Sequence, residues 1–147
     1  MSSKREYTVP TLTKGNYFSG FLYHPASQQI LLQQNLAEAP LTWTLLGSAN
    51  VKDFQTVCAK LLNVKLPPKN ILPIYNYIHK GTKYFVSYTE IKDLKDYPAK
   101  GKLCFTWLTL KQISKLPLSE QTKQDIIVGR RVIDSGIRRD TGERTIG

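Results

Sequence analysis

Residues 53–63, DFQTVCAKLLN, carry the clearest helical pattern in this sequence, and the other elements are predicted outward from them. Starting at Phe54, apolar residues recur at positions i, i+3, i+4, i+7 and i+8, which is typical of a helix that buries one face. Asp53 is suited to cap the N-terminus, and Asn63 to end the helix in a left-handed conformation. Pro67-Pro68 then prevents its continuation.

Two predicted β-hairpins lie on either side of this helix, at 17–34 and 71–91, because extended apolar runs there are joined by turn residues. A short apolar segment lies at 43–46, and a final strand is predicted at 103–108. Strands and helices that alternate in this way exclude an all-α or all-β domain. The two hairpins also exclude a strictly alternating doubly wound sheet. We therefore expect an α/β domain with a mixed sheet and helices on both faces.

The C-terminal part of the chain is predicted to be helical. A capping box at 109–112 opens a short helix. A longer helix follows, beginning at Ser119 or Thr122 and ending at Gly136. The remaining residues, 137–147, are polar and basic and are predicted to form a flexible tail.

Length and composition indicate one ordinary domain with a real core, since the chain has 147 residues, of which 41% are hydrophobic. No apolar run reaches the ~18 residues needed to span a bilayer, and the first residues are polar. We therefore expect a cytoplasmic protein with no membrane segment. Cys58 and Cys104 lie within apolar segments without metal-ligand spacing, which predicts two reduced, buried thiols.

The charge is strongly basic, with 21 Lys and Arg against 11 Asp and Glu, a net charge of +10 and a pI of about 9.7. Such a field attracts phosphate-bearing partners, namely nucleotides, nucleic acid or an anionic membrane surface. The lysines are spread at near-even spacing, as on a solvated surface. The arginines instead cluster near the C-terminus, at Arg130, Arg131, Arg138, Arg139 and Arg144.

Several segments resemble the Nudix domain. Residues 43–48, WTLLGS, resemble the W-x-hydrophobic-P-G-G segment that precedes the signature helix of that family. Residues 62–64, LNV, resemble the Leu-Gly-hydrophobic close of the helix, and 105–113 resemble the late tryptophan-bearing strand with the short helix after it. The order of elements is similar to that of a Nudix domain over 7–136. The resemblance implies an α/β/α sandwich with a mixed β-sheet.

The resemblance also implies a chemistry, because active Nudix enzymes carry the motif G-x5-E-x7-R-E-U-x-E-E-x-G-U, where U is a bulky aliphatic residue. Its carboxylates bind Mg²⁺ or Mn²⁺ and activate water for attack on a diphosphate linkage. This sequence departs from the motif. Counted from Gly47, the first glutamate position falls on Asp53; counted from the helix end, the E-E pair falls on Lys60 and Leu61. An ammonium group at a metal-ligand position repels the cation.

Binding requires fewer specific groups than catalysis, and the resemblance suggests where those groups lie. Lys52 and Lys60, at the signature helix, are candidates to contact phosphates. Tyr23 and Tyr84, from the two hairpins, are candidate ligand-binding aromatics. Asp53 is the one candidate catalytic residue, although a helix cap explains it as well.

Three functions remain open from the sequence. The first is a degenerate Nudix domain that binds a nucleotide or other phosphate-bearing small molecule without hydrolysing it, or that has a regulatory role. The second is an active hydrolase of a diphosphate-linked substrate with a displaced Mg²⁺ or Mn²⁺ site, in which Asp53 acts with Glu90, Asp93 or Asp96. The third is nucleic-acid binding through the arginine-rich C-terminus.

Overall fold

A computed structural model describes the backbone of residues 15–141 and the side chains of residues 15–135. Its elements, in chain order, are β1 (Gly15–His24), β2 (Gln29–Asn35), β3 (Trp43–Ala49), α1 (Phe54–Leu62), the 3-10 turn η2 (Pro68–Asn70), β4 (Leu72–His79), β5 (Thr82–Glu90), β6 (Leu103–Thr109), α2 (Leu110–Ile113) and α3 (Glu120–Thr141).

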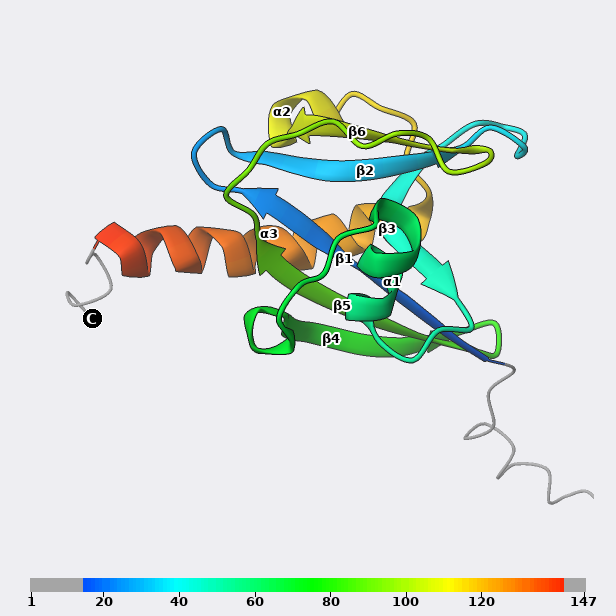
Figure 1. Cartoon of the computed structure of the whole chain (residues 1–147), viewed down its shortest axis with the longest axis horizontal. Coiled ribbons are helices and arrows are strands. Elements are labelled where there is room, and N and C mark those ends of the chain that lie inside the picture. The colour runs from blue at the N-terminus through cyan, green and yellow to red at the C-terminus, as the bar shows by residue number, and fades with distance from the viewer. Residues whose placement is uncertain (1–14, 142–147) are drawn as a thin grey trace, which may run out of the picture.

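All strands named above join one sheet in the order β4-β5-β1-β3-β2-β6. The sheet is mixed, because β1 and β5 run parallel while the other neighbouring strands are antiparallel. Helix α1 lies on one face and α3 crosses the other (Figure 1). The α/β/α sandwich expected from the sequence is thereby confirmed. No helix in the described part of the chain is long and apolar enough to cross a membrane.

The first predicted hairpin opens soon after its turn. Strands β1 and β2 pair only at Tyr23–Ile30 and His24–Gln29, and β3 then lies between them. The backbone of Gly47 does not pair with the backbone of β2, and the side chain of Gln33 hydrogen-bonds to it instead. Its Nε2 donates to the Gly47 carbonyl at 3.3 Å, and its Oε1 accepts from the Gly47 N–H at 3.2 Å. The buried backbone groups stay satisfied, as burial requires. The hairpin predicted at 17–34 is thus present at its turn, and β3 separates its two strands further from the turn.

The core has two layers because the central strands alternate between the two faces of the sheet. On the α3 face, Phe21, Tyr23 and Leu45 pack with Ile133. On the α1 face, a second apolar cluster gathers the residues that α1 buries, namely Phe54, Val57, Cys58, Leu61 and Leu62. The helical face predicted from the sequence is thus the face that packs on the sheet.

Both predicted ends of α1 are confirmed. The Asp53 carboxylate accepts hydrogen bonds from the Thr56 N–H at 2.7 Å and from its hydroxyl at 2.6 Å. Asn63 adopts φ 58° and ψ 41°, the left-handed conformation that closes a helix. The capping box formed by Thr109 and Gln112 is present at the start of α2.

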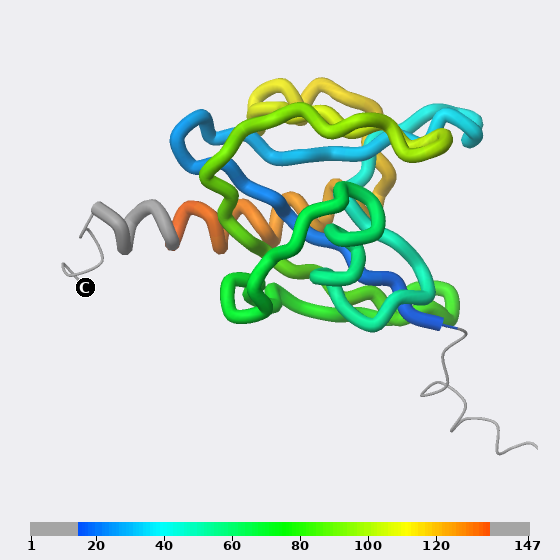
Figure 2. The backbone as a smooth tube through the Cα atoms, in the orientation of Figure 1, coloured from blue at the N-terminus to red at the C-terminus, as the bar shows by residue number. Residues whose placement is uncertain are grey.

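Helix α3 begins where the sequence predicts, since the Ser119 hydroxyl accepts from the Thr122 N–H at 3.2 Å. It continues through Gly136 to Thr141, so the predicted helix end at Gly136 was wrong. A glycine inside a helix costs only about 1 kcal/mol, and no proline follows to stop the helix. Figure 2 shows α3 passing behind the strands. Residues 7–14 and 142–147, the outer limits of the predicted domain and tail, lie outside the described residues.

Candidate ligand-binding site

The polar face of α1 makes local structural bonds. Gln55 donates to the Leu66 carbonyl at 2.7 Å, and Lys60 Nζ reaches the Ser48 hydroxyl at 3.4 Å. No aspartate or glutamate occurs between Phe54 and Leu62. The hydrogen bond from Thr56 lowers the pKa of Asp53, with smaller contributions from its backbone N–H and from Lys52, while burial acts in the opposite sense. Asp53 is thus held as a helix cap.

The residues of this face do not fit a divalent metal ion. Mg²⁺ and Mn²⁺ require several oxygen ligands, and α1 offers Lys60 where the resemblance implies a carboxylate. Within the described residues, no three His, Cys, Asp or Glu side chains gather closely enough to hold a metal. The carboxylates invoked for a displaced site, Asp53 with Glu90, Asp93 or Asp96, therefore form no such group.

A pocket of about 240 Å³ opens on the α3 face of the sheet. We call it the tyrosine pocket, and among its lining residues are Tyr17, Ser19, Thr44, Tyr77, Tyr84, Gln121 and Asp125. The rings of Tyr77 and Tyr84 stack with centroids 5.2 Å apart and planes 12° apart. Tyr17 packs on Tyr84 at 5.4 Å. Strands β1, β4 and β5 thus supply an aromatic wall, and the first turns of α3 add polar side chains.

Asp125 is a buried carboxylate in this pocket, with 5% of its surface exposed. Its Oδ1 accepts from the Tyr75 hydroxyl at 2.6 Å and from the Tyr77 hydroxyl at 3.2 Å. Burial raises the pKa of Asp125, and the two tyrosine hydrogen bonds oppose that effect. Oδ2 has one long contact, at 3.4 Å to Tyr77. It therefore keeps acceptor capacity for an N–H or O–H group of a ligand.

Two tyrosines of the pocket, Tyr17 and Tyr77, stay protonated over the physiological range. Burial, followed by the neighbouring Tyr84, raises the pKa of Tyr17 to about 12. Burial also raises the pKa of Tyr77 to about 12; the hydrogen bond with Gln121 lowers it and Asp125 raises it. Burial and the hydrogen bond to Asp125 raise the pKa of Tyr75 as well. The pocket therefore presents the neutral hydroxyl groups of Tyr17 and Tyr77 beside two carboxyl side chains, Glu38 and Asp125.

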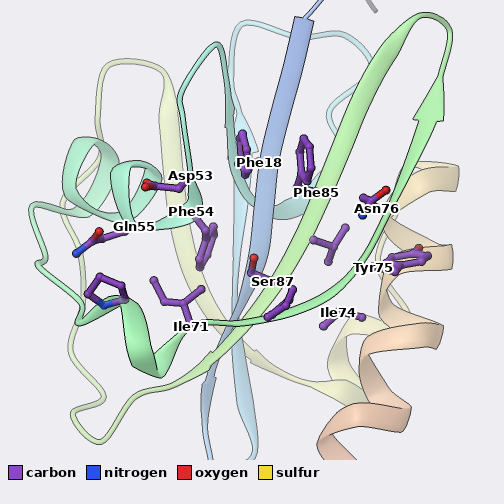
Figure 3. Close-up of a pocket in the computed structure, with 13 residues that line it drawn as sticks. Phe18, Asp53, Phe54, Gln55, Ile71, Ile74, Tyr75, Asn76, Phe85 and Ser87 are labelled. Atoms are coloured by element: carbon purple, nitrogen blue, oxygen red, sulfur yellow. The ribbon is translucent and has the colours of Figure 1, made fainter. Parts of the chain in front are cut away.

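A second pocket, of about 430 Å³, lies on the α1 face between the start of α1 and strands β4 and β5 (Figure 3). We call it the phenylalanine pocket, and Phe18, Phe54, Ile71, Asn76, Phe85 and Ser87 are among its lining residues. Phe18 and Phe85, on neighbouring strands, stack with centroids 4.5 Å apart and planes 8° apart. Asp53 lies at its edge on the α1 side.

The structure does not bring the predicted site residues together. Tyr84 lines the tyrosine pocket on the α3 face, whereas Lys60 reaches Ser48 from α1 on the opposite face. Lys52 is exposed in the segment between β3 and α1. Tyr23 is buried in the core beneath α3, with 2% exposed and its ring 6.2 Å from that of Tyr88.

Asp125 was not predicted from the sequence, and of the tyrosines that line the pocket only Tyr84 was a predicted ligand-binding residue. A signal for Asp125 does exist, because it lies four residues before Gly129 and eight before Ile133, which are buried against the sheet. An acidic residue on the buried stripe of an amphipathic helix requires a partner. Recognising the stripe depends on knowing which face of α3 meets the sheet.

Comparison with solved structures identifies the architecture as the Nudix fold. The NUDIX domain of Shewanella oneidensis NrtR, in complex with ADP ribose, superposes with a TM-score of 0.66 and 15% identity over 89% of this chain and 99% of that one. The C-terminal domain of mouse MUTYH, in complex with human PCNA, superposes with a TM-score of 0.65 and 13% identity, over 82% of this chain and 90% of that one. A MutT structure from work on Aliivibrio salmonicida and Vibrio cholerae superposes with a TM-score of 0.63 and 8% identity, over 77% of this chain and 97% of that one.

The likeness to these proteins lies in their folds. No family model matches the sequence, and no curated protein matches it. The Nudix fold expected from the order of elements is confirmed.

Proposed function

We propose that this chain is a Nudix-fold domain that binds a nucleotide or another phosphate-bearing small molecule without hydrolysing it. The observation that carries the proposal is a contrast between the two faces of the sheet. The signature helix α1 has no carboxylate on its polar face, while the α3 face holds an aromatic pocket with a buried carboxylate, Asp125. The NUDIX domain of NrtR, which has ADP ribose bound, supports a nucleotide as the ligand class.

The tyrosine pocket suits a heterocyclic base. Aromatic rings offer stacking surfaces to any planar heterocycle, and the Asp125 carboxylate can accept a hydrogen bond from a ring or amino N–H group. At 240 Å³ the pocket holds a single ring system rather than a whole dinucleotide. Tyr84, a predicted ligand-binding residue, is part of this arrangement.

In the proposal, the phosphates of the ligand extend out of the tyrosine pocket towards solvent. The predicted phosphate contacts Lys52 and Lys60 are not among the residues that line this pocket, and Lys60 reaches Ser48 from the opposite face of the sheet.

The test is a panel of nucleoside diphosphate derivatives, each with Mg²⁺ or Mn²⁺, read for phosphate release and for thermal stabilisation. We expect stabilisation without release. Asp125→Asn keeps the shape of the side chain but replaces one acceptor oxygen of the carboxylate by an NH2 donor. This substitution should abolish the stabilisation by the ligand. Lys100→Gln, an exposed residue before β6, serves as the control. Metal-dependent release at an ordinary enzymatic rate would contradict the proposal.

A further inference from the structure

The sheet surface beside α1 leaves two aromatic rings, Phe18 and Phe85, partly exposed. Helix α1 packs on β1 and β3, and Figure 1 shows no helix in front of β4. Phe18 and Phe85 lie at this boundary, stacked on each other and only half-buried. Adjacent strands that present aromatic side chains on an open sheet face are a recurrent platform for stacking nucleic-acid bases.

The phenylalanine pocket gives this platform depth. Its 430 Å³ fall in the range of small-molecule sites. Phe54 and Ile71 form one wall, facing Phe85 across the opening (Figure 3). Asn76 and Ser87 add an amide and a hydroxyl to this apolar lining, groups that can pair with the edge of a base.

The edge of the pocket is positively charged. Lys83 Nζ lies 5.3 Å from the centre of the Phe85 ring. Lys52 and Lys69 are exposed and adjoin the lining residues Asp53 and Pro68. Asp53 is the one carboxylate among the described lining residues, and both its hydrogen bonds from Thr56 hold it as a helix cap.

We propose that the phenylalanine pocket, flanked by Lys52, Lys69 and Lys83, binds single-stranded nucleic acid. One unpaired base enters the pocket and packs on the half-buried rings of Phe18 and Phe85, and the lysines contact phosphates on either side of it. A duplex hides the faces of its bases, so the pocket selects a single strand. The lysines come from three separate segments, which favours a strand with several phosphates over a free mononucleotide. This site lies on the opposite face from the tyrosine pocket, and the two pockets share no lining residue.

The test is fluorescence anisotropy of the full chain with a labelled single-stranded oligonucleotide of about 10 nucleotides, within the site sizes of single-strand binding modules. Phe85→Leu keeps an apolar side chain but removes the ring, and it should weaken binding by roughly 5- to 100-fold. Replacing Lys52, Lys69 and Lys83 together by Gln should lower the slope of log affinity against log salt by about 2. The surface lysine variant remains informative should Phe85→Leu unfold the protein.

The matched control replaces Lys100, Lys102 and Lys111 by Gln, the same change of charge near β6 at the other edge of the sheet. Asp125→Asn, in the tyrosine pocket, should leave binding of the strand unchanged. Equal losses in both lysine triples would show diffuse attraction and overturn the proposal. So would wild-type affinity in a folded Phe85→Leu variant, loss of binding only when Arg130 and Arg131 are replaced by Gln, or no binding at low salt.

Discussion

Gly129 of α3 lies against the ring of Phe21 in β1, so closely that a Cβ at position 129 would be 2.3 Å from Phe21 Cζ. Phe21 is fully buried at the centre of the sheet. The helix can approach the sheet this closely only because position 129 has no side chain. This contact helps set the distance between α3 and the strands that form the tyrosine pocket.

Gly129→Ala should therefore destabilise the fold, although alanine is the better helix former. The clash with Phe21 should cost about 1 to 3 kcal/mol, more than the roughly 1 kcal/mol that alanine gains in helix propensity. Urea unfolding followed by circular dichroism measures the difference. Arg130→Ala, at the neighbouring exposed position, controls for helix propensity; a stabilised Gly129→Ala variant would contradict the packing described here.

Asp53→Ala should cost about 1 kcal/mol of stability through loss of the helix cap. Asp53→Asn should keep most of it, since an amide oxygen also caps. Because the Thr56 hydrogen bond lowers the pKa of Asp53 in the folded state, its contribution is present above the unfolded pKa of about 3.9 and is lost as the pH falls through the folded value. Thermal unfolding of the wild-type protein and of Asp53→Ala should be compared from acid to neutral pH. The loss of stability in Asp53→Ala should disappear in acid.

Asp125 should produce the opposite dependence on pH. Burial raises its pKa above the ordinary value of 3.8, so the folded protein binds the proton more tightly than the unfolded chain. Stability should fall as the pH rises from about 3.8 through the raised pKa, and then level off. Asp125→Asn should remove this dependence. The measurement is the melting temperature of the wild-type protein and of the Asp125→Asn variant across this pH range. Parallel curves of melting temperature against pH would argue against a buried carboxylate.

Tyr75→Phe should destabilise the protein by about 1 to 3 kcal/mol, because it removes the shorter hydrogen bond to the buried Asp125. The double variant Tyr75→Phe with Asp125→Asn should lose less than the sum of the single variants, since the two residues share one interaction. Additive losses in a double-mutant cycle would show that the hydroxyl and the carboxylate are not coupled.

Cys58 should resist alkylation in the native protein. It is fully buried in the α1 layer, and burial raises the pKa of its thiol to about 12. The thiolate is the reactive form, so a native sample treated with iodoacetamide should show modification of Cys104 at most. Mass spectrometry after unfolding should show both thiols modified; native labelling of Cys58 would reveal opening of the α1 layer.

Local patterns predicted the elements whose signals lie close together in the chain. The cap at Asp53, the left-handed Asn63 and the capping box at Thr109 each depend on neighbours within a few residues, and all are confirmed. The insertion of β3 between β1 and β2 depends on pairings with distant strands, such as Ser19–Gly47. Nothing in the sequence near 17–34 encodes that insertion.

The candidate site was harder to predict than the fold for the same reason. Tyr84 could be nominated as an aromatic residue of a hairpin, but its neighbours in the pocket come from β1, β4 and α3. Asp125 becomes recognisable as a buried carboxylate only once the face of α3 that meets the sheet is known. The helix end at Gly136 was wrong because a glycine permits a helix end without requiring one.

Tyr84 and Phe85 are consecutive residues of β5, paired in parallel register with Tyr17 and Phe18 of β1. Because side chains alternate along a strand, these two adjacent pairs line pockets on opposite faces of the sheet. The two sites that we propose therefore meet at two adjacent residues of one strand. If binding at one site changes the affinity of the other, the second ligand must change the affinity of the first by the same factor.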